Sequence, residues 1–330
     1  MFSLKYYFKK HKKKFYLYAM YIIFFLITLI LSATINYGVQ EIFVRYKKFD
    51  DFNHRSSHKT LATRTGGIGI FSTILIISLY YYFQKVELFD YSLFIPLAIM
   101  FVIGVYDDLY NADFKLKFFL QIIVAKILID QGYVISNYYG LFGFYEVPWL
   151  LAQLSTVFVF LVVVNAINFI DGIDGLAITE VIKVILIIEF FSNDFTSLAP
   201  LGFLVITSIL PLYYYNFKKK RKVFLGDAGS MLLGTFAMIY ILQTLGENFM
   251  FKPELASNKT LFVILVIIYP LVDLLRVFIL RIKDGNSPFV ADQNHIHHLL
   301  SLNKKLSPAK TILFINIVSL FILFLWLMIF

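Results

Sequence analysis

The sequence predicts an all-α, polytopic integral membrane protein with about ten transmembrane helices. Of its 330 residues, 59% are hydrophobic and only 15% are charged, against about 25% charged in soluble domains. The hydrophobic residues fall in long runs that are separated by short polar segments. Because no repeat, low-complexity linker or separate soluble segment interrupts this pattern, we expect residues 1–330 to form a single membrane domain.

Ten apolar runs define the expected helices. Several are shorter than the ~20 residues that typically cross a bilayer, so their ends must recruit flanking Tyr, Phe and Lys, or the helices must be partly buried. The first run follows a basic segment as in a signal peptide, but its apolar part is too long and lacks a clear small-residue cleavage site, which indicates a retained span. The runs lie at residues 15–36, 67–83, 92–106, 117–130, 150–168, 175–192, 198–215, 229–246, 260–280 and 311–330.

The distribution of Lys and Arg assigns the loops to two sides of the membrane. Successive loops alternate between a set rich in Lys and Arg, the basic set, and an opposite set that carries only Lys85, Lys252 and Lys259. The positive-inside rule therefore makes the basic set cytoplasmic. The same alternation leaves the basic segment 5–14 outside, against the rule, so either the downstream loops override this segment or the first run is not a simple span. We weight the five loops more because they average over more positions. The basic set comprises the loops near 37–66, 107–116, 169–174, 216–228 and 281–310.

Composition also excludes several classes of function. The chain has no cysteine, which excludes disulfides, thiolate metal sites and cysteine nucleophiles. The formal net charge of +9 does not indicate a nucleic-acid partner, because the basic residues are scattered among short loops and the positive-inside rule accounts for them.

A polar cluster ends the fifth apolar run, in the sequence NAINFIDGIDGL at residues 165–176. Asn168, Asp171 and Asp174 are three residues apart, so they lie near one face if the stretch is helical. An ionisable side chain at a membrane boundary costs free energy unless it faces a partner or a water-filled cavity, which marks a candidate functional site. The alternative is a helix end, where Asn and Asp cap the helix and Gly terminates it.

Acidic residues also border two other runs on the predicted cytoplasmic side. Asp107 and Asp108 are adjacent, and because neighbouring carboxylates repel, we expect a cation or a basic ligand group to offset them. A helix cap would explain only one of the two. Asp227 lies between Gly226 and Gly229 in GDAGS, where a carboxylate and backbone amides can face the same metal and anion.

Basic side chains on the same side are candidates to bind phosphate. Three histidines within four positions could also indicate zinc, but they lack the i, i+4 pair of zinc-binding helices and no thiolate is available. For the histidines we prefer imidazoles that donate to phosphate oxygens, with an ordinary surface loop as the alternative. The first loop, taken by itself, is typical of an ordinary basic cytoplasmic loop. The candidates are His58, Lys59 and Arg64 in the first loop and Arg281, His295, His297 and His298 in the last segment.

Together these side chains predict phosphoryl transfer. Carboxylates without cysteine suit a hard cation such as Mg²⁺, which bridges one or two carboxylates to substrate phosphates, with Mn²⁺ as an expected substitute. The cationic side chains would clamp the phosphates. The alternative from another class is a membrane carrier for an anionic lipid or nucleotide, but transporters usually place key polar groups near the bilayer midplane, whereas these lie at the ends of spans.

Five motifs resemble those of the polyprenyl-phosphate N-acetylhexosamine-1-phosphate transferase family, and they occur in the family's order over nearly the whole chain. The HIHH ending is similar to the branch that transfers N-acetylglucosamine-1-phosphate. Thr63 and Phe52 depart from the family, which often has proline at both positions, and these departures affect loop stiffness more than chemistry. The motifs are NHRSSH with RTGG, VYDD, NAINFIDGIDGL, FLGDAGS and SPFVADQNHIHH.

The resemblance implies the transfer of an N-acetylhexosamine-1-phosphate from a UDP-N-acetylhexosamine to undecaprenyl phosphate at the cytoplasmic face of the bacterial inner membrane, to start a cell-envelope glycan. It implies Mg²⁺ as cofactor and is compatible with a homodimer; transfer of phospho-N-acetylmuramoyl-pentapeptide is the related alternative. By matching motif, the catalytic candidates are Asp107, Asp108, Asp174, Asp227 and His295, the metal ligands Asp227, Asp107, Asp108 and Asn168, and the substrate-binding residues His58, Lys59, Arg64, Asn168, Asp171, Arg281, His297 and His298.

Overall fold

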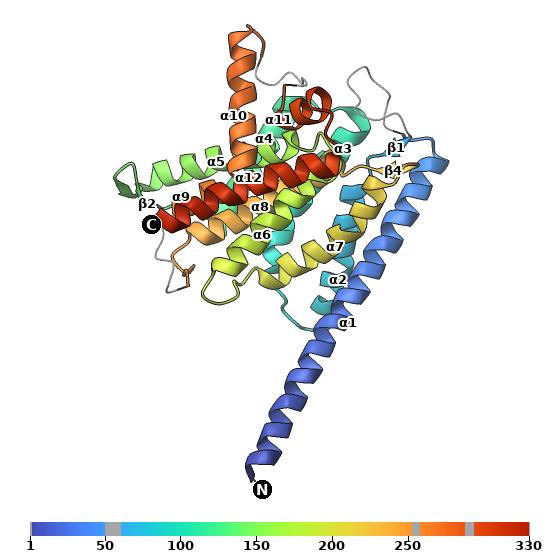
Figure 1. The fold of residues 1–330 in the computed structure, drawn as a ribbon, viewed down its shortest axis with the longest axis vertical. Helices are drawn as coiled ribbons and strands as arrows, with labels where there is room; N and C mark the ends of the chain where they lie inside the picture. The colour runs from blue at the N-terminus through green and yellow to red at the C-terminus, as the bar shows by residue number, and fades with distance from the viewer. Residues whose placement is uncertain (1, 50–60, 253–257, 288–293, 330) are drawn as a thin grey trace.

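The computed structural model of the chain is a bundle of helices, which confirms the predicted all-α class (Figure 1). It describes residues 2–49, 61–252, 258–287 and 294–329, with backbone only for 2–21 and 302–303. The long helices are α1 (Phe2–Arg45), α2 (Gly66–Phe83), α3 (Phe94–Tyr110), α4 (Phe114–Asp130), α5 (Trp149–Phe169), α6 (Leu176–Phe191), α7 (Ala199–Phe217), α8 (Gly226–Leu245), α9 (Lys259–Val266), α10 (Ile268–Lys283) and α12 (Pro308–Ile329).

The short elements lie in the segments that connect these helices. Two single-turn elements are η1 (Tyr91–Leu93) and α11 (Ile296–His298), and a π-helical turn, η2 (Leu299–Asn303), follows α11. The strands are β1 (Ala62–Thr63), β2 (Asn137–Leu141), β3 (Phe144–Glu146) and β4 (Lys222–Val223).

Each of the ten apolar runs is helical, but the helices differ in their capacity to cross a membrane. Within the described part of the chain, six are long and apolar enough to do so, namely α1, α2, α3 with η1, α5, α8 and α12. Helices α4 and α6 have only 17 and 16 residues. The protein is therefore a multi-pass membrane protein, and the count of ten spans stays a prediction.

The expectation of one continuous helix over residues 260–280 is wrong. Helices α9 and α10 meet at an angle of 73°, and α10 projects from the bundle (Figure 1). Pro270 explains the position of the break, because a proline ring clashes with the carbonyl four residues earlier, which is that of Val266, the last residue of α9.

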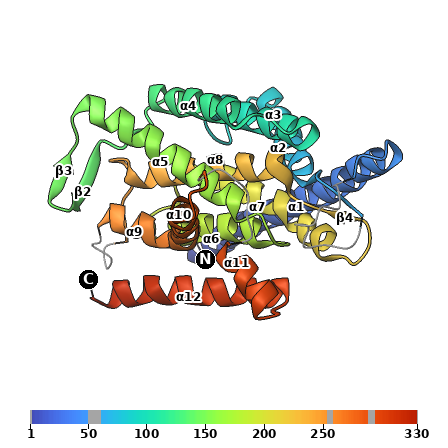
Figure 2. The same cartoon turned by 90° about the horizontal axis from the view of Figure 1, so that it is seen from above.

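Helix α8 forms the centre of the bundle. It packs against α2, α3, α5, α6 and α9, and Figure 2 shows it in the middle of the helices. Of its apolar span, 94% is buried, as expected of a helix that is hydrophobic on all sides. Its N-terminus, which carries Asp227, is therefore surrounded by the ends of other helices.

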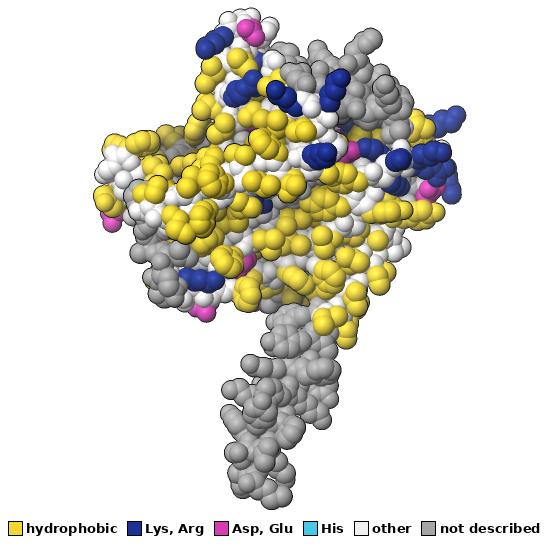
Figure 3. Space-filling model, viewed as in Figure 1, with side chains coloured by type: hydrophobic (Ala, Val, Ile, Leu, Met, Phe, Trp, Pro, Cys, Tyr) yellow, Lys and Arg dark blue, Asp and Glu magenta, His cyan; other side chains and the backbone are white. Residues whose placement is uncertain are grey.

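The loops gather at two opposite ends of the bundle. At one end β1 pairs in parallel with β4, in the register Ala62↔Lys222 and Thr63↔Val223. At the other, β2 and β3 form an antiparallel hairpin that the sequence analysis did not anticipate. Lys and Arg side chains gather around the first end, and hydrophobic side chains cover the middle of the visible face (Figure 3). The N-terminal end of α1 lies away from β1 and β4 (Figure 1), as the alternation of the runs predicted.

Candidate active site

Asp108 caps the N-terminus of the central helix. It lies in the last turn of α3, and its Oδ1 and Oδ2 accept hydrogen bonds from the backbone N–H groups of Asp227 (3.0 Å) and Ala228 (2.9 Å). The first amides of a helix have no intrahelical partner and attract negative charge. We expected the backbone amides after Gly226 to face a substrate anion. For the amides of Asp227 and Ala228 this expectation is wrong, because they donate to the carboxylate of Asp108.

Gly226 permits this close approach of α3 to α8. Its φ of +74° is a conformation that side chains disfavour, and an added Cβ would lie 2.7 Å from Oδ2 of Asp108. Helix α8 begins at this glycine. Asp227 and Ser230 are thus both inside the helix, which starts three residues before the apolar run suggested.

Asp227 is held from the neighbouring helix α5. The Asn168 side-chain amide donates to Asp227 Oδ1 (2.5 Å) and to Ser230 Oγ (2.7 Å). The donation fixes one carboxylate oxygen of Asp227 and leaves its other oxygen to bind a ligand. These two acceptors on α8 also determine the orientation of the Asn168 side chain, because its nitrogen must face them.

Asp107 faces a different partner from its neighbour. Its Oδ2 lies 2.5 Å from Lys117 Nζ, and its Oδ1 accepts from the Ala112 backbone N–H (2.8 Å). The side chain is 8% exposed. The basic group that the adjacent carboxylates were expected to need is thus supplied to Asp107 by Lys117.

The loop after α5 is not helical, so Asn168, Asp171 and Asp174 do not share one helix face. Helix α5 ends at Phe169, and α6 begins at Leu176. Asp174 forms an ion pair with Lys222 of β4. Desolvation raises the pKa of Asp171, and the nearby carboxylates of Asp227 and Asp108 raise it further. Asp171 therefore lies close enough to the other acids for their charges to act on it.

Asp107, Asp108, Asp171 and Asp227, which we call the acidic cluster, come from two helices and a loop. Arg64 contributes a guanidinium whose Nη1 lies 3.8 Å from Asp108 Oδ1. The cations beside the cluster do not prevent the rise in the pKa of Asp171. This concentration of carboxylate oxygens has the hard-ligand chemistry that suits a divalent cation such as Mg²⁺.

The last segment packs on the loop after α5 through Gly172. An ideal Cβ at Gly172 would lie 2.4 Å from Nε2 of His297 and 3.0 Å from Nε2 of His298, so a larger residue would separate the two segments. His297 Nδ1 lies 3.1 Å from the Tyr269 hydroxyl. Burial lowers the pKa of His297 well below its ordinary value, and the neighbouring His298 and His295 lower it further. His297 is thus neutral at pH 7.

A buried carboxylate holds His295. Asp273 of α10 is fully buried, and its two oxygens lie 2.6 Å from His295 Nδ1 and 2.6 Å from the backbone nitrogen of Ile296. The ligand atoms of Asp273, His295 and His297 lie within 4.8 Å of one another, which makes them a possible metal-binding group of the described chain. In the structure, however, Nδ1 of both histidines already faces an oxygen of Asp273 or Tyr269.

The two predicted phosphate-binding cations that the structure describes, Arg64 and Arg281, lie in different surroundings. Arg64 is 38% exposed beside Asp108. Arg281 is 4% exposed, and its guanidinium carbon lies 5.7 Å from the centre of the Phe169 ring. Phe169 directly follows Asn168 in the sequence. His58 and Lys59 lie outside the described residues.

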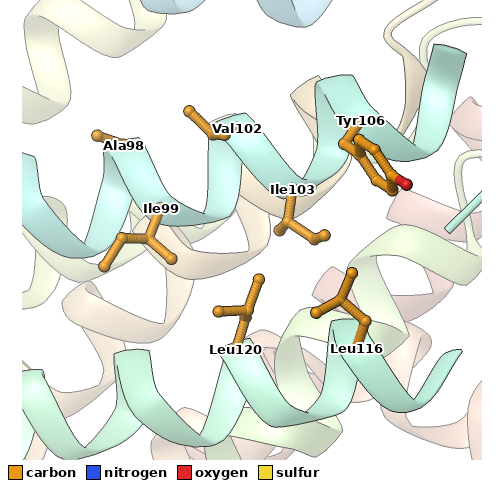
Figure 4. A pocket seen from close by; sticks show the side chains of 7 residues that line it. All are labelled: Ala98, Ile99, Val102, Ile103, Tyr106, Leu116 and Leu120. Atoms are coloured by element: carbon orange, nitrogen blue, oxygen red, sulfur yellow. The ribbon is translucent and has the colours of Figure 1, made fainter. Parts of the chain in front are cut away.

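An apolar groove of about 470 Å³ lies between α3 and α4 (Figure 4). Its lining has hydrocarbon chemistry and no carboxylate or amine, so it does not suit a nucleotide. It is lined by Ala98, Ile99, Val102, Ile103 and Tyr106 of α3 and by Leu116 and Leu120 of α4.

Several residues of the site were missed in the sequence. Lys117, Ser230, Lys222 and Asp273 each contact a predicted site residue. Asp273 carried a usable signal, because it is an acid within a run of apolar residues, where an ionisable side chain is costly. The other three are common residue types at helix starts and in basic loops.

Comparison with known proteins shows relatives across most of the chain. The family described as "Glycosyl transferase family 4" matches residues 90–245. Proteins named undecaprenyl-phosphate alpha-N-acetylglucosaminyl 1-phosphate transferase are similar. The one from Haemophilus influenzae is 31% identical over 82% of this chain and 76% of its own length. That from Pasteurella multocida is 32% identical over 76% of this chain and 70% of its own. The protein from Salmonella typhi is 29% identical over 83% of this chain and 75% of its own length.

Proposed function

The chain belongs to glycosyl transferase family 4, and we propose that it transfers N-acetylhexosamine-1-phosphate, specifically N-acetylglucosamine-1-phosphate, from a UDP-sugar to undecaprenyl phosphate. The product is a lipid-linked diphosphate sugar that starts a cell-envelope glycan. One observation carries the proposal: Asp108, Asp171 and Asp227 converge at the start of the central helix, in a chain whose relatives are named for this activity.

The chemistry that this site must support is phosphoryl transfer. A phosphate oxygen of undecaprenyl phosphate forms a bond to the phosphorus that bears the sugar. The bond from that phosphorus to the oxygen of UMP breaks, and the electron pair leaves with UMP. Because a phosphate monoester has a second pKa of about 6, the attacking oxygen is largely anionic at neutral pH, and no general base is required.

The acidic cluster fits Mg²⁺, with Mn²⁺ as a substitute, because its donors are carboxylate oxygens. We assign Asp227 as the first ligand, with Asp108 or Asp107 and the Asn168 side-chain oxygen completing the set. The bound ion would neutralise the diphosphate and the leaving UMP as charge develops.

Other residues position these ligands or bind phosphate. Asn168 orients Asp227, and Lys117 holds Asp107 against repulsion by the other acids. Arg64, Arg281, His295, His297 and His298, together with His58 and Lys59, are the proposed partners of the phosphates, because cations and imidazole N–H groups donate to phosphate oxygens. Asp174 stays a proposed nucleotide contact, although one of its oxygens already pairs with Lys222.

We place the site at the cytoplasmic face of the bacterial inner membrane. The basic loops lie at this end of the bundle, and a nucleotide sugar is a water-soluble substrate. A homodimer stays a prediction from the resemblance.

The test is radiolabelled sugar incorporation into a lipid extract, with purified protein, undecaprenyl phosphate, Mg²⁺ and a panel of UDP-amino sugars. We expect label from UDP-N-acetylglucosamine in a diphosphate-linked lipid, and more than from UDP-N-acetylmuramoyl-pentapeptide. Transfer from the pentapeptide donor alone would assign the related reaction. Nucleotide or lipid translocation in vesicles, without a new diphosphate bond, would assign a carrier.

A further inference from the structure

The buried acid Asp273 has no place in the chemistry described so far. It lies on α10, the helix that projects beyond the break at Ile267, and is fully buried. A buried carboxylate without partners would cost several kcal/mol, roughly, yet this one has two donors at 2.6 Å, both from the HIHH segment. Among the described residues, both hydrogen-bond donors to this acid therefore come from that segment.

The contact with His295 determines which ring nitrogen carries a proton. An ionised carboxylate can only accept hydrogen bonds, so Nδ1 of His295 is the donor to Asp273 Oδ2. This leaves Nε2 to face a ligand. A carboxylate that binds one imidazole nitrogen fixes the tautomer and the orientation of the ring.

The second contact fixes the backbone beside the histidine. Asp273 Oδ1 accepts from the N–H of Ile296, the first residue of α11. The His295 ring then lies edge-on to Phe169, with ring centres 6.0 Å apart. Phe169 ends α5 directly after Asn168, which binds Asp227. The single acid thus places the histidine segment against the helix end that carries the proposed metal-binding residues.

The geometry points to Asp273 as the positioning residue for His295 in sugar-phosphate transfer, with Nε2 of the His295 ring aimed at the substrate phosphates. This inference rests on the proposed function. Asp273 itself does not touch substrate; it acts through the orientation of the imidazole.

A double-mutant cycle tests the coupling. Asp273→Asn keeps the size of the side chain but opposes one donor with its own NH₂ group, and we expect kcat to fall about 10–100-fold, as for other residues that orient a ligand, with a smaller change in KM for the UDP-sugar. In the His295→Gln background the same change should cost less than about threefold, because a residue that acts only through His295 has nothing left to position.

A matched control is Glu189→Gln, which also removes a carboxylate that accepts from a backbone amide and a side chain. Glu189 lies near the C-terminal end of α6, at the other end of the bundle from the acidic cluster. It should leave kcat within about twofold. An equal loss from Asp273→Asn in the wild-type and His295→Gln backgrounds would overturn the inference.

A second measurement does not depend on activity. Hydrogen exchange of the backbone amide of Ile296 should be at least about tenfold faster in Asp273→Asn and unchanged in His295→Gln, which keeps the bond from Ile296 to Asp273. Unchanged exchange in Asp273→Asn would also overturn the inference. An inactive wild-type protein in which this exchange pattern holds would overturn the proposed transferase function while supporting the anchoring by Asp273.

Discussion

The two ends of the bundle surround their partly buried acids in opposite ways. At the end with the hairpin, Glu189 accepts from the Thr196 backbone N–H (3.0 Å), the Thr196 hydroxyl (2.6 Å) and the Tyr240 hydroxyl (3.0 Å). All three donors are neutral. At the other end, the acids of the acidic cluster face one another as well as their partners, and the pKa of Asp171 is raised.

This difference separates structure from function. A carboxylate surrounded by neutral donors contributes to stability, whereas carboxylates that repel one another reduce it and are expected where a ligand supplies the missing positive charge. Variants at the two ends should therefore have opposite consequences for activity and stability.

The largest effect on activity is expected at Asp227. Asp227→Asn should reduce transferase activity about 10²–10³-fold, as for the loss of one group that stabilises charge in a transition state. The melting temperature without metal should not fall, because the change removes repulsion from Asp107 and Asp108. Activity assays and thermal unfolding in detergent measure both quantities; a variant that loses stability in proportion to activity would contradict the separation.

A smaller effect is expected where the two loops meet at Gly172. In Gly172→Ala the new Cβ must displace the His297 ring, which lies 2.4 Å from the ideal position. Overpacking of this kind typically costs about 1–3 kcal/mol, and the shift should reduce kcat about tenfold. Gly132→Ala serves as a comparison for the assay, because no atom lies within 4 Å of that Cβ, although its φ of +91° adds local strain.

The opposite end should show the reverse pattern. Glu189→Gln loses charge-assisted hydrogen bonds, so unfolding should cost about 1–2 kcal/mol less. Activity should be retained within about twofold. Chemical denaturation beside the transferase assay tests this expectation, and a large loss of activity in a stable Glu189→Gln protein would show that the two ends are coupled.

The smallest effect is a dependence of stability on pH at His297. Its folded pKa lies well below its ordinary value of about 6.5, so below about pH 6.5 the unfolded chain binds a proton that the folded chain does not. This contribution therefore destabilises the fold increasingly as the pH falls below that value. His297→Gln should reduce the slope of stability against pH between about pH 7 and pH 5.5 by at most about 1.4 kcal/mol per unit; an unchanged slope would show that His297 is charged in the fold.

The helices were predictable because apolar runs in a membrane protein are long and continuous. The run at 67–83, for example, corresponds to α2 at Gly66–Phe83. The bend at Ile267 was not predicted, although Pro270 is consistent with it. Proline alone does not indicate such a break, since Pro211 lies inside α7; packing around each helix decides the outcome.

The chemical types at the site were predictable, but their pairing was not. Asp107 and Asp108 are adjacent in sequence, yet they contact Lys117 and the start of α8, respectively. No local pattern states which helix end meets which, because these contacts depend on packing between segments that lie far apart in the chain. For the same reason Asp273 could be identified as unusual in the sequence but not as a partner of His295.

The most direct test of the account is UMP release by purified protein with undecaprenyl phosphate, Mg²⁺ and UDP-N-acetylglucosamine, with Asp227→Asn and Glu189→Gln in parallel. We expect release that requires lipid and metal, equals the diphosphate-linked lipid formed, is lost in Asp227→Asn and is kept in Glu189→Gln. Release that persists in folded Asp227→Asn, or that needs neither lipid nor metal, would contradict the assignment of the acidic cluster as the transferase site.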